Sequence, residues 1–278
     1  MRRILLSALV LLSGLQETTL ADTRMEIVVS IPPQQWLVEK IGGDRVEVTV
    51  LVTPGESPTT YMPTDAQVTH LMQSRIYFRI GVPFERGLWF DAVSKMGRFT
   101  MVDLRDGIEL RGDDPHIWLS PRLLSVQAAT VAAALSLQDP NSRILFEENL
   151  EALQARLRIL DEEIGQRLEP FVGRAFFVFH PSWGYFANEY GLQQVAIEVE
   201  GREPSDRQLT VLQSEAREAE ITTVFVQPQI HGRGAKAFAA AIDARLEILD
   251  PLAAVVAVNL AETADKMLES FGGRKAHE

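Results

Sequence analysis

Short β-branched and aromatic runs alternate along the chain with longer segments whose apolar residues recur every three or four positions. In the first half, each run is closed by a proline or glycine signal such as Pro32-Pro33 or Pro54-Gly55, and a helical segment follows. Strand–helix–strand order of this kind predicts a parallel sheet. The predicted strands cover residues 25–31, 46–52, 76–81 and 100–104, and the predicted helices lie at 35–41, at 64–74 and around Trp89.

Two longer helices are predicted in the middle of the chain. The first begins at Ser120, with Pro121 as its first helical residue, and ends near Leu137. The second runs from about Ser142 to Leu168 without an internal proline. At 1.5 Å per residue it is roughly 40 Å long, about the length of a whole domain. A helix of that length is expected to connect two lobes.

The strand–helix pattern then begins again. This repetition predicts an α/β fold of two parallel-sheet lobes joined by one long helix, with an N-terminal lobe at 22–141, the linking helix at 142–170 and a C-terminal lobe at 171–278. The predicted strands of the second half are 175–179, 194–198, 223–226 and 246–249, and the predicted helices are 182–190, 206–219, 231–244 and 258–271.

The first 21 residues resemble a cleaved secretory leader, with a basic start, an apolar run at 4–15 and small residues around Ala21. We therefore expect an exported protein with no membrane span after removal of the leader. The chain has no cysteine, which excludes disulfides, thiolate metal sites and a lipid-anchor cysteine. Any metal must be bound by nitrogen and oxygen atoms.

Acidic residues outnumber basic ones, 38 to 27, and the formal net charge is −11. A chain with this balance is not expected to bind nucleic acid. The 46% of hydrophobic residues are enough to form substantial cores.

Three residues are candidate metal ligands. His116 lies between Pro115 and Pro121 on stiff backbone, whereas His180 and Asp250 each end a predicted strand directly before a proline. Ligands of parallel sheets bind beyond the carboxyl ends of the strands, so the three could converge in a cleft between the lobes. Two imidazoles and a carboxylate suit zinc, manganese or iron. The alternative for each residue alone is a polar strand end satisfied by backbone groups.

Motifs along nearly all of the chain after the leader resemble the metal-binding proteins of bacterial ABC importers for zinc and manganese. The resemblance implies two lobes joined by a rigid helix, a metal in the cleft, a periplasmic location and an ABC permease in the inner membrane as partner. Its motifs are Ile31-Pro32-Pro33, Gly42-Gly43-Asp44, the Pro58–Thr64 loop, Gly81–Glu85, Asp114–Pro121, Phe179–Phe186, Tyr190-Gly191-Leu192 and Asp250-Pro251-Leu252.

The resemblance implies that His116, His180 and Asp250 are metal ligands. The family's first ligand is a histidine after the proline of the Pro58 loop, and this chain has Thr59 there. A neutral hydroxyl is a poor ligand, so the site is either three-coordinate with water or completed by another residue. The sequence leaves four candidates for that residue: Glu56, Glu198, Gln229 and His231.

The sequence thus predicts a monomeric, non-enzymatic binding protein for Zn²⁺, with Mn²⁺ and Fe²⁺ as alternatives. A binding protein for a chelated metal is a rival, because Thr59 leaves room for a bulkier ligand. A metal-dependent hydrolase is another, since two histidines and a carboxylate also form catalytic sites. Against it, the chain has no HExxH or GxSxG motif. His70, in a predicted helix, is expected to be a surface or packing residue.

Overall fold

The computed structural model describes residues 24–198, 201–229 and 233–272. The predicted leader at 1–21 and the candidate ligand His231 lie outside these ranges. The predicted lobe boundaries at 141 and 170 stay a prediction. Among the described residues, no helix has the length and apolar character needed to cross a membrane.

The first sheet contains four parallel strands in the order β2-β1-β3-β4. Helix α2 begins after Thr64 because Thr64 and Gln67 make a reciprocal capping box at its N-terminus. The strands are β1 (Met25–Val29), β2 (Val46–Val50), β3 (Ile76–Arg79) and β4 (Thr100–Asp103), and the helices are α1 (Pro32–Gly42), α2 (Asp65–Gln73) and α3 (Leu88–Met96).

The second sheet repeats this topology in the order β6-β5-β7-β8, again with parallel strands. The predicted pair of parallel-sheet α/β units is therefore confirmed. The strands are β5 (Ala175–Val178), β6 (Gln193–Ala196), β7 (Thr223–Val226) and β8 (Arg245–Ile248), and the helices are α6 (Gly184–Glu189), α7 (Asp206–Glu218), α8 (Arg233–Ala241) and α9 (Val256–Ser270).

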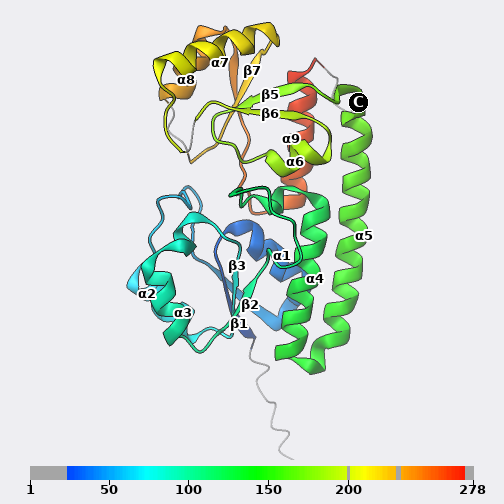
Figure 1. The fold of residues 1–278 in the computed structure, drawn as a ribbon. Coiled ribbons are helices and arrows are strands. Elements are labelled where there is room, and N and C mark those ends of the chain that lie inside the picture. Colours follow the sequence, from blue (N-terminus) through cyan, green and yellow to red (C-terminus); the bar gives the residue numbers. More distant parts are fainter. Residues whose placement is uncertain (1–23, 199–200, 230–232, 273–278) are drawn as a thin grey trace, which may run out of the picture.

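The long helix α5 (Arg143–Leu168) runs beside both lobes (Figure 1). Its 26 residues span about 39 Å, as expected. It does not stand alone: α4 (Pro121–Gln138) and α1 pack against it at the first lobe, and α9 packs against it at the second. Its buried apolar residues therefore join both lobes through a packed layer of helices.

One continuous hydrophobic core extends from the first sheet through α4, α5 and α9 to the second sheet. At the junction, the 3-10 turn Ile117–Leu119 is buried, and the Trp118 indole Nε1 donates to the Pro251 carbonyl at 2.6 Å. A smaller separate core lies between the second sheet and the helices α7 and α8. The direct contact between the lobes fixes how the segments before α4 and after β8 face each other.

The loop after β3 is held by a buried carboxylate. Glu85 accepts hydrogen bonds from the backbone N–H groups of Ile80 and Gly81, at 3.0 and 2.6 Å, and from the Ser30 hydroxyl. Its side chain is fully buried. Burial raises the pKa of Glu85, and these hydrogen bonds act in the opposite direction. The network fixes the start of the Val82-Pro83 segment.

Candidate metal centre

A cavity of about 700 Å³ lies where the two lobes face each other. Val82 and Pro83 contribute to one wall, so the Glu85 network shapes the cavity directly. The first lobe also contributes Ser57, Pro58, Thr59, Asp114, His116 and Trp118, and the second contributes Phe179, His180, Glu198, Gln227, Gln229 and Leu252.

The second sheet places a polar side chain beyond the carboxyl end of each strand. His180 follows β5 by two residues, Glu198 follows β6 by two, Gln227 comes directly after β7, and Asp250 follows β8 by two. The segments stay together past the strand ends, since the Glu198 N–H donates to the Phe179 carbonyl at 3.0 Å. The parallel topology thus gathers these side chains along one edge of the sheet.

His116 is held by the Asp114 side chain, and Asp114 is in turn bonded to the second lobe. Asp114 Oδ1 lies 3.0 Å from the His116 backbone N–H and 2.7 Å from its ring Nδ1. The Tyr185 hydroxyl of the second lobe donates to the Asp114 carbonyl at 3.2 Å. Gly184 allows the close approach, because a Cβ there would lie 2.7 Å from Asp114 Oδ2. The two hydrogen bonds to Asp114 orient the His116 ring, and the stiffness of its backbone stays a prediction.

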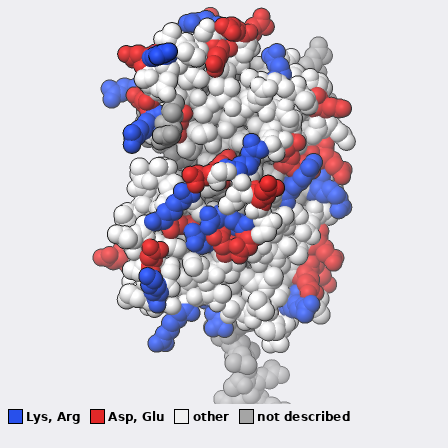
Figure 2. Space-filling model, viewed as in Figure 1, with Lys and Arg blue, Asp and Glu red and all other residues white. Residues whose placement is uncertain are grey.

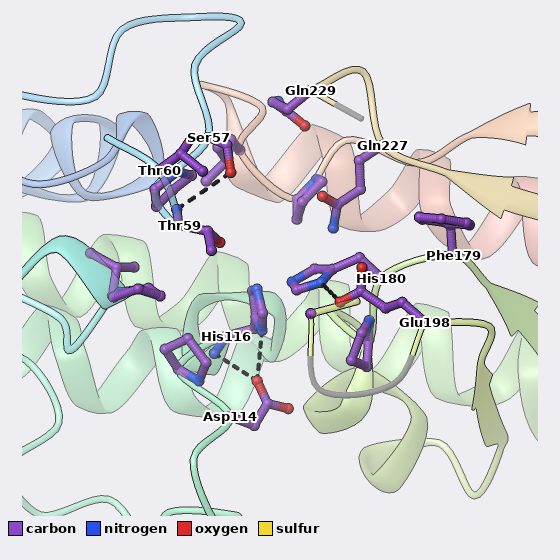
Figure 3. Close-up of a pocket in the computed structure, with 18 of the residues that line it drawn as sticks. Ser57, Thr59, Thr60, Asp114, His116, Phe179, His180, Glu198, Gln227 and Gln229 are labelled. Carbon is purple, nitrogen blue, oxygen red and sulfur yellow. Dashed lines mark hydrogen bonds and ion pairs between the residues drawn. The ribbon is translucent and has the colours of Figure 1, made fainter. Parts of the chain in front are cut away.

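His180 is oriented in the same way, through a hydrogen bond between its Nδ1 and Glu198 Oε1. An ionised carboxylate only accepts, so Nδ1 is the donor in both rings, and in the neutral tautomer with this proton the lone pair lies on Nε2. The free edges of both rings point into the same part of the cavity, next to Thr59 (Figure 3). A carboxylate behind each imidazole is the usual support of a metal-binding histidine.

The two rings are close enough to bind one ion. Their centroids are 5.5 Å apart and their planes are inclined by 74°. Two imidazoles on a tetrahedral zinc, at Zn–N distances of about 2.0–2.1 Å, have centroids about 5 Å apart. Burial lowers the pKa of His116, while Asp114 acts in the opposite direction. His116 is therefore neutral near neutral pH, and neutral imidazole is the form that binds metals.

The profile of the family described as "Zinc-uptake complex component A periplasmic" matches residues 27–269. The chain belongs to this family. The resemblance inferred from the motifs is confirmed.

Relatives and solved structures agree with this assignment. A putative metal-binding protein of Chlamydia muridarum is 28% identical over 249 residues, covering 86% of this chain and 88% of that protein. The high-affinity zinc uptake system protein ZnuA of Bacillus subtilis is 24% identical over 253 residues, covering 82% and 79%. A crystal structure of ZnuA is 44% identical, with a TM-score of 0.85 and coverage of 89% and 99%.

The structure brings His116 and His180 together in the cavity, whereas Asp250 lies outside the cavity lining. The described residues lining the cavity include Gln229 and Leu252 but not Asp250. Asp250 Oδ1 accepts from Gln229 Nε2 at 2.9 Å and from the Leu252 N–H at 3.0 Å. Within residues 24–198, 201–229 and 233–272, no three His, Cys, Asp or Glu residues form a group able to hold a metal. A ligand role for Asp250 stays a prediction.

The sequence reasoning missed the carboxylates that orient the histidines and the amide of Gln227. A local signal existed for Asp114, which precedes His116 by two residues across a proline. Glu198 was a candidate fourth ligand and was not expected to orient His180, because that contact depends on the pairing of β5 with β6. Of the other candidates for the fourth ligand, Gln229 lines the cavity, whereas Glu56 accepts from the Thr53 hydroxyl at 2.7 Å in the exposed loop.

Proposed function

We propose that this chain captures zinc between its two lobes and delivers it to an ABC permease. The observation that carries the proposal is the pair of imidazoles, one from each lobe, each with Nδ1 bound to a carboxylate and the opposite edge facing one shared space. Nitrogen donors favour zinc over manganese by ligand preference. A crystal structure of a ZnuA deletion mutant with zinc bound is 43% identical, which supports the same cargo.

The proposed ligands are His116 and His180, with Asp250 as the third when bare zinc binds. Asp250 reaches the ion by exchanging its hydrogen bond from Gln229 for a bond to the metal. A water molecule completes the four positions of a tetrahedral site. Manganese is the alternative cargo, since a manganese-transporter lipoprotein of Streptococcus pneumoniae, PsaA, is 27% identical over 222 residues.

Binding rather than catalysis is proposed because two of the carboxylates lining the cavity are already engaged. Asp114 and Glu198 both accept from imidazole nitrogens, so neither stands ready as a general base for a metal-bound water. The family's description as periplasmic supports an exported protein that acts from the periplasmic side of the permease. We propose that it does so as a monomer.

Calorimetric titration of the metal-stripped protein with zinc, and in parallel with manganese, tests the proposal. His116→Ala and His180→Ala are expected to abolish tight one-to-one zinc binding. His70→Ala is the matched control, because His70 bonds the Thr49 hydroxyl at 3.0 Å, away from the cavity, and should leave binding unchanged. Zinc binding that survives both cavity substitutions would refute the site.

A further inference from the structure

The cavity is much larger than a metal ion needs. A zinc ion with two water molecules occupies on the order of 100 Å³, since a water takes roughly 30 Å³ of liquid. The cavity volume is about 700 Å³, within the range of roughly 300–1,000 Å³ that is typical of pockets for small organic molecules. The volume leaves space for a ligand beside the ion.

The protein supplies few donors at the point where the histidines converge. His116 and His180 provide two nitrogens, and Thr59 presents only a neutral hydroxyl to the same space. Glu198, a strand-end carboxylate that lines the cavity, is bonded to the His180 ring, and Asp250 is bonded to Gln229 and Leu252. A tetrahedral zinc therefore takes two further donors from outside this pair of residues.

The walls around that point suit an organic group. Pro58 and Val82 face the cavity from one lobe, and Phe179 and Leu252 face it from the other. Gln229 adds an amide group to this mostly apolar lining. A largely apolar wall matches a small ligand with an apolar ring or chain.

The charges around the cavity select a cation. Asp113, Asp114, Glu198 and Glu203 line it with carboxylates, against the single guanidinium of Arg202 in the described lining. On the face seen in Figure 2, acidic and basic side chains intermingle at the level where the lobes meet. A zinc ion bound by a singly charged anion keeps a net positive charge, so it still suits a lining in which carboxylates predominate.

We infer that the cavity takes zinc together with a small bidentate chelator, a monoanion with one nitrogen and one oxygen donor. This rests on the proposed function of His116 and His180 as zinc ligands. The two imidazoles and the two chelator atoms complete the four positions of zinc, while Asp250 keeps its hydrogen bonds. Thr59 is the residue that determines this specificity, because a histidine at position 59 would occupy the position that the chelator uses.

Picolinate, with a pyridine nitrogen and a carboxylate oxygen on an aromatic ring, is a suitable probe. Metal-stripped protein is dialysed against zinc chloride alone, sodium picolinate alone, and both in equimolar amounts. Zinc is then measured by metal analysis and picolinate by its ultraviolet absorption. We expect picolinate to be retained only with zinc, one per protein, and to raise the apparent zinc affinity about tenfold, which corresponds to about 1.4 kcal/mol.

Thr59→His provides the decisive comparison. It should bind zinc alone more tightly than the parent and retain no picolinate, because three protein nitrogens leave one position on the ion. Thr53→His, in the same loop but outside the cavity lining, should behave like the parent in both respects.

The outcomes separate this inference from the proposed function. Zinc bound one-to-one without retained picolinate would overturn the inference and leave the proposed function standing. Picolinate retained equally by the parent, Thr59→His and His116→Ala would also overturn it, since the chelate would then bind elsewhere. Protein that retains zinc under neither condition would refute both.

Discussion

Replacing Glu189 with glutamine should remove one pH dependence from the stability of the protein. At the meeting point of α4, α5 and α6, Arg122 Nε lies 2.9 Å from both Asp161 Oδ2 and Glu189 Oε1. One guanidinium thus faces two carboxylates. The Glu189 side chain is 6% exposed, and its Oε1 has no well-formed hydrogen bond among the described residues.

Burial, followed by the charge of Asp161, raises the pKa of Glu189 to about 7, although Ser120 and Arg122 act in the opposite direction. The ordinary pKa of a glutamate is 4.5, so the folded state binds this proton more tightly than the unfolded chain does. The resulting stabilisation is fully present below pH 4.5 and is lost as the pH rises through 7. Each pH unit counts about 1.4 kcal/mol, so the loss is on the order of 3 kcal/mol.

Thermal unfolding of the metal-stripped parent and Glu189→Gln, followed by circular dichroism from pH 5 to pH 8, measures the effect. Near pH 5 the two should have similar Tm values, and at pH 8 the variant should be more stable by roughly 6–12 °C, at about 2–4 °C per kcal/mol for a chain of this size. Glu147→Gln is the control, because Glu147 pairs with Arg143 on an exposed helix face.

A Tm difference that stays constant across this pH range would refute the reasoning. So would a Glu189→Gln variant that is less stable than the parent at pH 8, because the ion pair with Arg122 would then outweigh the burial of the carboxylate.

Three further substitutions test other parts of the structure. Asp114→Asn should weaken zinc binding about 10–100-fold in calorimetry, because the amide no longer orients the imidazole as a carboxylate does. Trp118→Phe removes the hydrogen bond between the lobes, so it should lower the zinc affinity and should lower the free energy of unfolding in urea by about 1–3 kcal/mol. Trp89→Phe is the control, because it loses an indole hydrogen bond within one lobe and should leave zinc binding unchanged. Glu85→Ala should lower the free energy of unfolding by roughly 3–5 kcal/mol in the same urea assay, because it leaves buried donors without an acceptor. Glu39→Ala, at an exposed residue, is the control and should lower it by less than about 0.5 kcal/mol.

The elements were predictable where local chemistry marks their ends. Ser120 does accept from the Leu123 N–H at the start of α4, with Pro121 as first helical residue, and Thr64 caps α2. Strand ends were less well defined: the predicted strand at 194–198 ends at Ala196. Beyond it, Ile197 and Glu198 still donate to the neighbouring segment, but they have left the regular ladder. The pattern of apolar residues alone does not show where the strand leaves the ladder.

The site was predictable in its location and less so in its members. Proline-flanked positions in both lobes predicted that His116, His180 and Asp250 could converge in a cleft, and the structure does bring the two histidines together. Asp250 turns toward the Gln229 amide and the Leu252 N–H, contacts that depend on a loop conformation that no spacing encodes. Each histidine's carboxylate partner likewise depends on geometry that only the folded chain supplies.

The pairing of each histidine with a carboxylate of its own lobe determines what release of the metal requires. His116 stays bonded to Asp114, and His180 to Glu198, whatever the distance between the lobes. A small separation is then enough, because Zn–N bonds of about 2 Å do not stretch to follow it. The polar contacts that resist separation include the Trp118 indole on the Pro251 carbonyl, the Tyr185 hydroxyl on the Asp114 carbonyl and the Arg122–Glu189 ion pair. The continuous hydrophobic core adds to them. Under the proposed function, docking to the permease would have to weaken these contacts between the lobes, without unfolding either half of the site.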